Sequence, residues 1–321
     1  MAVYTEVSDE ELRAFVSRFD IGEILAAKGI AEGVENSNYL IHTSAGFYFL
    51  TLYEKRVSEA DLPYFLGLME HLSSRGLVCP RPVKNRRGEA LGRLVGRPAA
   101  IVTFLDGISV RRPSAAHCRS LGEALARLHE IGRDFHLTRA NTLSVSGWRP
   151  LFEMAASRAD TVAPGLGSEI EAALMPLEGQ WPKGLPVGNI HADLFTDNVL
   201  FIGDKVSGVI DFYFACTDAF AYDLAVCLNA WCFEADFSFN LTKGQALLAG
   251  YRGVRSPTQA EVGALPLLAR GAALRFLLTR LVDWLNVPAG ALVKPKDPLE
   301  YLRKLRFHAR VASAAEYGWV S

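Results

Sequence analysis

The sequence predicts an α+β fold in two lobes: a small N-terminal lobe built on an antiparallel sheet, and a larger, mainly helical C-terminal lobe. Three observations support this prediction. Short apolar runs separated by turn residues dominate roughly the first hundred residues. Longer apolar runs with helical spacing dominate after Asp106-Gly107. The chain has 321 residues, which suits roughly two domains of about 150 residues each.

The N-terminal lobe should open with a helix, because Ser8 and Glu11 have the spacing of a capping box and apolar residues follow at helical spacing. A second helix spans about 58–75 and ends at Gly76. Alternating apolar residues predict the strands of the sheet, and a hairpin at 44–46 joins the first two. The expected strands are 39–41, 47–53, 89–94 and 99–105.

The C-terminal lobe should begin after a hinge near residue 106, where the sequence changes character without a long linker. A helix at about 114–130 has leucines at helical spacing. One hairpin, with its turn at Gly203-Asp204, interrupts the helices; its strands are expected at 199–202 and 206–210. The further helices are expected at 151–160, 167–177, 223–234, 259–287 and 299–315.

The composition argues against several classes of protein. The net charge is −1 and no long basic run occurs, so nucleic-acid binding has no electrostatic support. No window of about 18 residues is free of charge, and the N-terminus lacks the pattern of a secretory signal, so we expect no membrane span and no export. The five cysteines are scattered, without the paired spacing of a zinc site. A reduced, cytoplasmic protein is the expectation.

The residues that indicate chemistry are Asp193, Asn198 and Asp211, in His191-Ala192-Asp193-Leu194-Phe195-Thr196-Asp197-Asn198 and Val209-Ile210-Asp211-Phe212. Asn198 and Asp211 lie at the two ends of the predicted hairpin, so they can approach one point. Amide and carboxylate oxygens are the ligands that Mg²⁺ takes alongside phosphate oxygens. We therefore expect these two residues to hold magnesium for phosphoryl transfer.

Asp193 lies in the loop before the hairpin, where it can face an acceptor hydroxyl. A carboxylate near its ordinary pKa of about 3.9 is ionised at neutral pH. We expect it to orient the hydroxyl and to take the proton late in the reaction, as general base. His191 is expected to support the loop by hydrogen bonds rather than to act as a base. Asp223 precedes an apolar helix and could cap it.

The pattern His-x-Asp-x-x-x-x-Asn, followed by a strand ending in Asp-Phe, resembles the catalytic loop and metal-binding segment of protein kinases. The sequence is closer to the aminoglycoside phosphotransferase and choline kinase-like group, which 121–129 and 218–225 also resemble. The resemblance implies a two-lobed protein kinase-like fold. Residues 1–106 would form the nucleotide-binding lobe, and 107–321 the catalytic and acceptor-binding lobe.

Within that group, stretches along most of the chain resemble bacterial homoserine kinases of the phosphotransferase-like type. The resemblance implies ATP and Mg²⁺ as cofactors and L-homoserine as a small-molecule partner, phosphorylated to O-phospho-L-homoserine on the way to threonine. It implies no nucleic-acid or membrane partner, and oligomeric state stays open. The stretches are 33–39, 49–54, 68–72, 79–82, 187–195 and 273–276.

The predicted nucleotide site departs from the kinase pattern in two ways. The phosphate loop contains only Gly33, so Asn36, Ser37 and Asn38 are expected to supply donors instead. Thr51 occupies the strand position where a phosphate-pairing lysine is expected, and Lys55 is displaced by four residues, so the usual lysine partner of Glu70 is missing. Around Thr103 and Leu105 we expect a hinge whose backbone groups bind adenine.

The acceptor pocket needs a cation and an anion for an amino-acid substrate. The candidates lie on one predicted helix and are Arg275, Arg280 and Asp283. On that helix, Arg280, Asp283 and Trp284 share one face. Three alternatives stay open at this point. The acceptor could be choline, methylthioribose or an aminoglycoside; the chain could be an inactive nucleotide-binding regulator; or it could be a metal-dependent phosphohydrolase. The mixed basic character of 236–321 favours an acceptor with a carboxylate.

Overall fold

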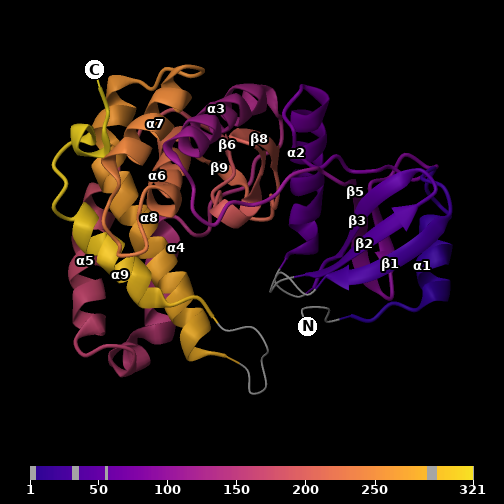
Figure 1. Cartoon of the computed structure of the whole chain (residues 1–321). Helices are drawn as coiled ribbons and strands as arrows, with labels where there is room; N and C mark the ends of the chain where they lie inside the picture. Colours follow the sequence, from indigo (N-terminus) through magenta and orange to yellow (C-terminus); the bar gives the residue numbers. More distant parts are fainter. Residues whose placement is uncertain (1–4, 31–35, 55–56, 288–294, 321) are drawn as a thin grey trace. The chain divides into compact units, whose positions relative to one another are not determined.

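The structure, a computed structural model, describes residues 5–30, 36–54, 57–287 and 295–320. Contacts between Cα atoms divide the chain into two compact units (Figure 1). The first contains Met1–Gly107 and the short segment Ser207–Tyr213. The second contains Ile108–Val206 and Phe214–Ser321. The predicted boundary near residue 106 stays a prediction about lobes, and the segment 207–213 was not part of it.

The first unit is built on a five-stranded sheet in the order β1-β2-β3-β5-β4, in which neighbouring strands are antiparallel. The helix α1 lies against this sheet (Figure 1), and its Leu12, Phe15 and Val16 join the buried cluster beneath the strands. The elements are α1 (Asp9–Val16), β1 (Ile24–Ile30), β2 (Ser37–Thr43), β3 (Gly46–Leu52), α2 (Leu62–Ser74), β4 (Leu91–Leu94) and β5 (Arg97–Thr103).

Two local predictions in this unit are confirmed in detail. Ser8 caps α1 in a reciprocal capping box with Glu11. α2 ends at Ser74, and Gly76 takes φ +92°, the left-handed conformation that favours glycine after a helix. The strand β1 was missed. Its Ile24–Ile30 segment lies at the sheet edge and is mostly exposed, so it shows no alternation of buried and exposed residues.

The second unit is mainly helical and contains two short two-stranded sheets, β6-β9 and β7-β8. The strand β8 runs into the segment 207–213, which belongs to the first unit. α7, β6 and β9 were not predicted. The elements are α3 (Ala115–Ile131), α4 (Val145–Ala155), α5 (Leu166–Gln180), β6 (Val187–Ile190), β7 (Val199–Ile202), β8 (Lys205–Val209), β9 (Cys216–Ala219), α6 (Phe220–Trp231), α7 (Leu241–Arg252), α8 (Gln259–Leu285) and α9 (Pro298–His308).

The longest helix of the described chain is α8, which packs against α4, α6 and α9 (Figure 1). By length and composition alone it could cross a membrane, but 61% of its most apolar window is buried inside the protein. It also contains the buried Arg275 and Arg280. These observations fit a buried core helix.

Candidate active site

The loop that carries Asp193 follows β6, which pairs antiparallel with β9 so that Ile190 lies opposite Cys216. Ala192, the residue before Asp193, has φ +61°. A residue with a Cβ adopts this left-handed conformation at a cost, and such backbone strain persists where the surroundings enforce it, often at functional sites. The loop from His191 to Asn198 therefore has a conformation that its neighbours impose.

Asp223, at the start of α6, is one of these neighbours. Its carboxylate is fully buried and accepts the backbone N–H groups of His191 and Ala192, both at 2.8 Å. The Nε2 of His129 lies 3.1 Å from the same carboxylate. Burial raises the pKa of Asp223, but the contacts with His129 and His191 outweigh it, so the pKa lies below its ordinary value. Asp223 therefore braces the loop as an ionised group.

The brace continues through a buried chain of polar groups behind His129. Burial lowers the pKa of His129, so its neutral ring donates one N–H to Asp223. The other ring nitrogen accepts from the Tyr251 hydroxyl at 2.7 Å, and that hydroxyl accepts from Arg255 at 3.1 Å. Arg255 pairs with the buried Glu261 at 2.8 Å. A connected network of this kind resists movement, because removing one member leaves others buried without partners.

Arg275 and Trp231 hold the loop from other directions. The guanidinium of Arg275, on α8, donates to the carbonyl of Ala192 and lies 4.0 Å from the Asp193 carboxylate. The indole of Trp231 donates to the carbonyl of Leu194 at 2.7 Å. From the sequence, we predicted that Arg275 could bind the substrate. In the structure it is buried behind the loop, where it orients the backbone next to Asp193.

Asp193 itself is 18% exposed, and Asn198 donates to both its backbone carbonyl (2.8 Å) and its carboxylate (3.3 Å). Burial raises the pKa of Asp193 to about 6, against the lowering effect of Arg275 and Lys296. The ordinary value assumed from the sequence is therefore wrong for this carboxylate. It is still mostly ionised at pH 7, and it is a stronger base than an exposed aspartate.

The predicted metal ligands Asn198 and Asp211 belong to different units, and each is described within its own. The amide nitrogen of Asn198 is used by Asp193, which leaves its amide oxygen as the atom that can bind a hard cation. Asp211 is exposed and has φ +65°. Their joint binding of one ion stays a prediction.

The side chains expected at the metal are one amide and one carboxylate. Across residues 5–30, 36–54, 57–287 and 295–320, no group of three or more His, Cys, Asp or Glu side chains is arranged to hold a metal. A self-sufficient metal site would need such a group. An amide, a carboxylate and the oxygens of a bound nucleotide form a donor set that Mg²⁺ accepts.

In the first unit, the three predicted phosphate-site residues make specific bonds. The amide oxygen of Asn36 accepts the backbone N–H of Glu54 at 3.2 Å, and the Ser37 hydroxyl donates to the Glu54 carboxylate at 2.8 Å. Asn38 accepts from the Thr51 hydroxyl at 2.9 Å. Thr51 thus fixes the Asn38 amide so that its nitrogen is the remaining donor. Gly33 lies outside the described residues.

The expected partner of Glu70 was missing from the sequence pattern, and the structure supplies one. Lys84, in the extended segment after α2, lies 3.3 Å from the Glu70 carboxylate. Neither Lys84 nor this pairing was predicted, because residues fourteen positions apart on separate elements share no sequence periodicity. Lys55 lies outside the described residues.

At the predicted hinge, Thr103 ends β5, and its hydroxyl and amide both bond to the backbone of Arg81 at 2.9 Å. In the part of the chain that the structure describes, no protein group bonds to the backbone amide or carbonyl of Leu105. Next to them, the rings of Phe49 and Phe104 stack at 5.6 Å, and Phe104 remains 38% exposed. This aromatic face was not predicted; free backbone groups beside exposed rings suit a planar heterocycle.

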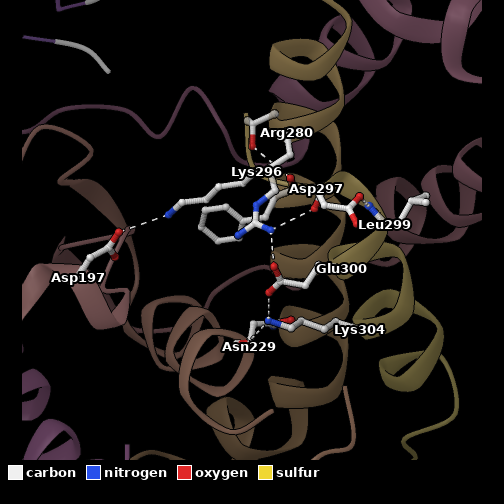
Figure 2. A network of polar contacts seen from close by, with 10 residues as sticks. Asp197, Asn229, Arg280, Lys296, Asp297, Leu299, Glu300 and Lys304 are labelled. Atoms are coloured by element: carbon white, nitrogen blue, oxygen red, sulfur yellow. Dashed lines mark hydrogen bonds and ion pairs between the residues drawn. The ribbon is translucent and has the colours of Figure 1, made fainter. Parts of the chain in front are cut away.

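Arg280 and Asp283, the other predicted substrate ligands, differ in their surroundings. Arg280 pairs with Glu300 at 2.7 Å and donates to the carbonyl of Asp297 at 3.2 Å (Figure 2). Asp283 is exposed. Lys296, which the sequence analysis did not consider, lies beside this network and acts electrostatically on Asp193.

The model of the phosphotransferase enzyme family matches residues 26–256 of the chain. The chain belongs to this family. Within the phosphotransferase family, it resembles curated proteins over their whole length. It is 69% identical to a homoserine kinase of Methylobacterium sp. (strain 4-46) over 319 residues, which cover 99% of both chains. It is 66% identical to a homoserine kinase of Nitrobacter winogradskyi over 318 residues, 99% of this chain and 98% of the relative.

Solved structures of other phosphotransferases share the fold. An amicoumacin kinase in complex with AMP-PNP and Ca²⁺ matches with a TM-score of 0.69 and 16% identity, covering 94% of this chain and 92% of its own. A choline kinase from Cryptosporidium parvum matches with a TM-score of 0.68 and 15% identity, covering 94% and 95%. The protein kinase-like α+β fold expected from the sequence is thereby confirmed.

Proposed function

We propose that the chain is a homoserine kinase. It transfers the γ-phosphoryl group of ATP to the side-chain hydroxyl of L-homoserine and forms O-phospho-L-homoserine, a step in threonine biosynthesis. The observation that carries this proposal is the identity of 65–69% to curated homoserine kinases over 99% of the chain. The braced loop around Asp193 supports it, because the enzyme needs a carboxylate placed to receive a hydroxyl proton.

In the proposed reaction, Asp193 orients the acceptor hydroxyl and takes its proton as the bond to phosphorus forms. Arg275 and Asn198 keep the carboxylate in place. Asn198 and Asp211 are the proposed ligands of Mg²⁺, which when bound neutralises charge on the nucleotide phosphates.

We assign ATP binding to the lobe spanning 1–106 and acceptor binding to 107–321. Asn36, Ser37 and Asn38 face the phosphates in this proposal, while the hinge at Thr103 and Leu105 binds adenine. The free backbone of Leu105 and the exposed ring of Phe104 support the adenine assignment.

We place the enzyme in the cytoplasm, as a protein that acts on a small molecule without a nucleic-acid or membrane partner. The five cysteines are free and buried, which suits a reducing compartment. The net charge of −1 offers no attraction to nucleic acid.

The test is ADP release with Mg²⁺ and ATP in the presence of L-homoserine, choline, methylthioribose or an aminoglycoside. We expect turnover with L-homoserine to exceed the others at equal concentration. A strong signal from choline without one from L-homoserine would overturn the proposal. ATP binding without turnover of any acceptor would indicate a regulator, and steady phosphate release without an acceptor would indicate a phosphohydrolase.

A further inference from the structure

An exposed ion pair lies at the solvent-facing edge of the loop that carries Asp193. The ammonium of Lys296 is 3.4 Å from the carboxylate of Asp197 (Figure 2). The two side chains are 60% and 62% exposed. Asp197 lies in the turn Thr196–Asn198, one residue before Asn198, and Lys296 lies just before α9. The ring of Phe195 lies 5.1 Å from the Lys296 ammonium. The pair thus connects the loop to a segment that is 99 positions away in the sequence.

The backbone next to Lys296 is anchored, whereas its side chain is held weakly. Asp297 caps α9 by accepting the N–H of Leu299 at 2.8 Å, and its carbonyl accepts from Arg280. Glu300 engages both Arg280 and Lys304 at 2.7 Å (Figure 2). Those two cations therefore share Glu300, a carboxylate that is 31% exposed. Of the three cations labelled in Figure 2, only Lys296 has a mostly exposed carboxylate as its ion-pair partner.

Both members of the exposed pair lie at the loop of the proposed base. Asp197 follows Asp193 by four residues in the same loop, and Lys296 contacts that loop through Asp197 and the ring of Phe195. One positive and one negative group therefore lie beside this loop at exposed positions. Arg275 also acts on Asp193, but it is buried and bonded to the backbone.

The chemistry of a free amino acid matches this pair. A zwitterion presents an ammonium and a carboxylate on one carbon, and the hydroxyl of homoserine stands two methylene groups away. An exposed ion pair gains little over its solvated groups, so exchanging its internal partner for a substrate group costs little. We propose that Lys296 binds the α-carboxylate of the acceptor and Asp197 binds its α-ammonium group, the pair opening to receive them. This inference rests on the proposed function.

In this arrangement the Lys296–Asp197 pair selects acceptors that carry both charges. Arg280, which the sequence suggested for the carboxylate, instead positions the backbone at Asp297 from which Lys296 extends. The alternative interpretation is a surface ion pair that binds no ligand. Removing such a pair would leave the KM for L-homoserine unchanged.

The test compares Lys296→Met and Asp197→Asn with two matched controls. Asp204→Asn removes a carboxylate that is 66% exposed and also lies 3.4 Å from a side-chain nitrogen, Nε2 of His117. Lys205→Met removes an exposed lysine outside the charges that act on Asp193. Kinetics are measured at pH 8.5, well above the pKa of Asp193 of about 6, so that altered titration of the base does not contribute.

With L-homoserine we expect each site variant to raise KM by about ten- to a hundredfold, the loss of one charge-assisted hydrogen bond. The KM for ATP and kcat should change by less than about threefold, and Lys296→Arg should restore part of the affinity. Both control variants should retain the wild-type KM.

Truncated acceptors, used as substrates or as competitive inhibitors, identify which charged group of the acceptor each residue binds. The penalty of Lys296→Met should disappear with 3-aminopropan-1-ol, which lacks the carboxylate. The penalty of Asp197→Asn should disappear with 4-hydroxybutanoate, which lacks the ammonium.

An unchanged KM for L-homoserine in both site variants, or a rise equal for full and truncated acceptors, overturns the inference and leaves the proposed function standing. Absence of L-homoserine turnover by the unaltered protein overturns both.

Discussion

Behind the loop from His191 to Asn198, charged groups are buried and paired, whereas at its outer edge the charges of Lys296 and Asp197 are more than half exposed. Asp223 and Arg275 are desolvated and bonded to the loop backbone. Removing one member of a buried pair is costly, while exposed pairs contribute little to stability. The inner groups therefore fix the geometry of Asp193, whereas the outer groups are exposed to solvent and to a ligand.

The largest expected effect comes from Asp193→Asn, which keeps the shape of the side chain but removes its basicity. We expect kcat with L-homoserine to fall by about 10²–10⁴-fold, the usual value of a general base. The KM for ATP should stay close to that of the unaltered protein. The measurement is ADP release under saturating substrates. Retention of full kcat would show that the braced carboxylate does not act on the hydroxyl.

Asp223→Ala tests the inner side of the comparison. It leaves the amides of His191 and Ala192 and the ring of His129 without their buried acceptor. We expect the free energy of unfolding to fall by about 3–5 kcal/mol, the scale for breaking a buried ionic contact. Urea denaturation measures it. Asp204→Ala, at an exposed position, should change stability by less than about 0.5 kcal/mol. Equal losses of unfolding free energy in the two variants would show that the buried groups behind the loop are no more important for stability than exposed ones.

The pH dependence of kcat/KM tests both the burial of Asp193 and the influence of the exposed Lys296. The base must be ionised, and burial raises the pKa of Asp193 to about 6, so activity should fall about tenfold per pH unit below that value. Lys296 lowers this pKa, so Lys296→Met should move the inflection to higher pH. The control Lys205→Met should leave it in place. An inflection near pH 4 in the unaltered protein would indicate that Asp193 is not desolvated in solution.

The smallest expected effect concerns the first unit, where uncharged bonds replace the missing lysine. Thr51→Val removes the donor that orients Asn38. A neutral hydrogen bond contributes about 1 kcal/mol, so the KM for ATP should rise about fivefold while the KM for L-homoserine stays unchanged. Thr43→Val removes a hydroxyl donor to the Gly46 carbonyl elsewhere on β2 and should leave the KM for ATP unaltered. Equal changes in the KM for ATP in the two variants would indicate that Asn38 does not bind the phosphates.

Much of the local structure could be predicted because its causes lie within a few residues. The capping box of Ser8 and Glu11 and the left-handed Gly76 after α2 depend on neighbours in sequence. The bond from Asn198 to the Asp193 carbonyl also spans only five positions, but it was not predicted. β1 was missed since it is a strand only through pairing with β2, and its exposed residues show no alternation.

The two-lobed α+β class and the loop of Asp193 could be recognised in the sequence, and the family resemblance indicated phosphoryl transfer. Which charges are buried and which are exposed depends on tertiary contacts. Asp223 meets His129 across 94 positions, and Lys296 meets Asp197 across 99. Desolvation and pairing depend on segments brought together by packing, so the raised pKa of Asp193 and the accessible charges beside it have no signature in any local pattern.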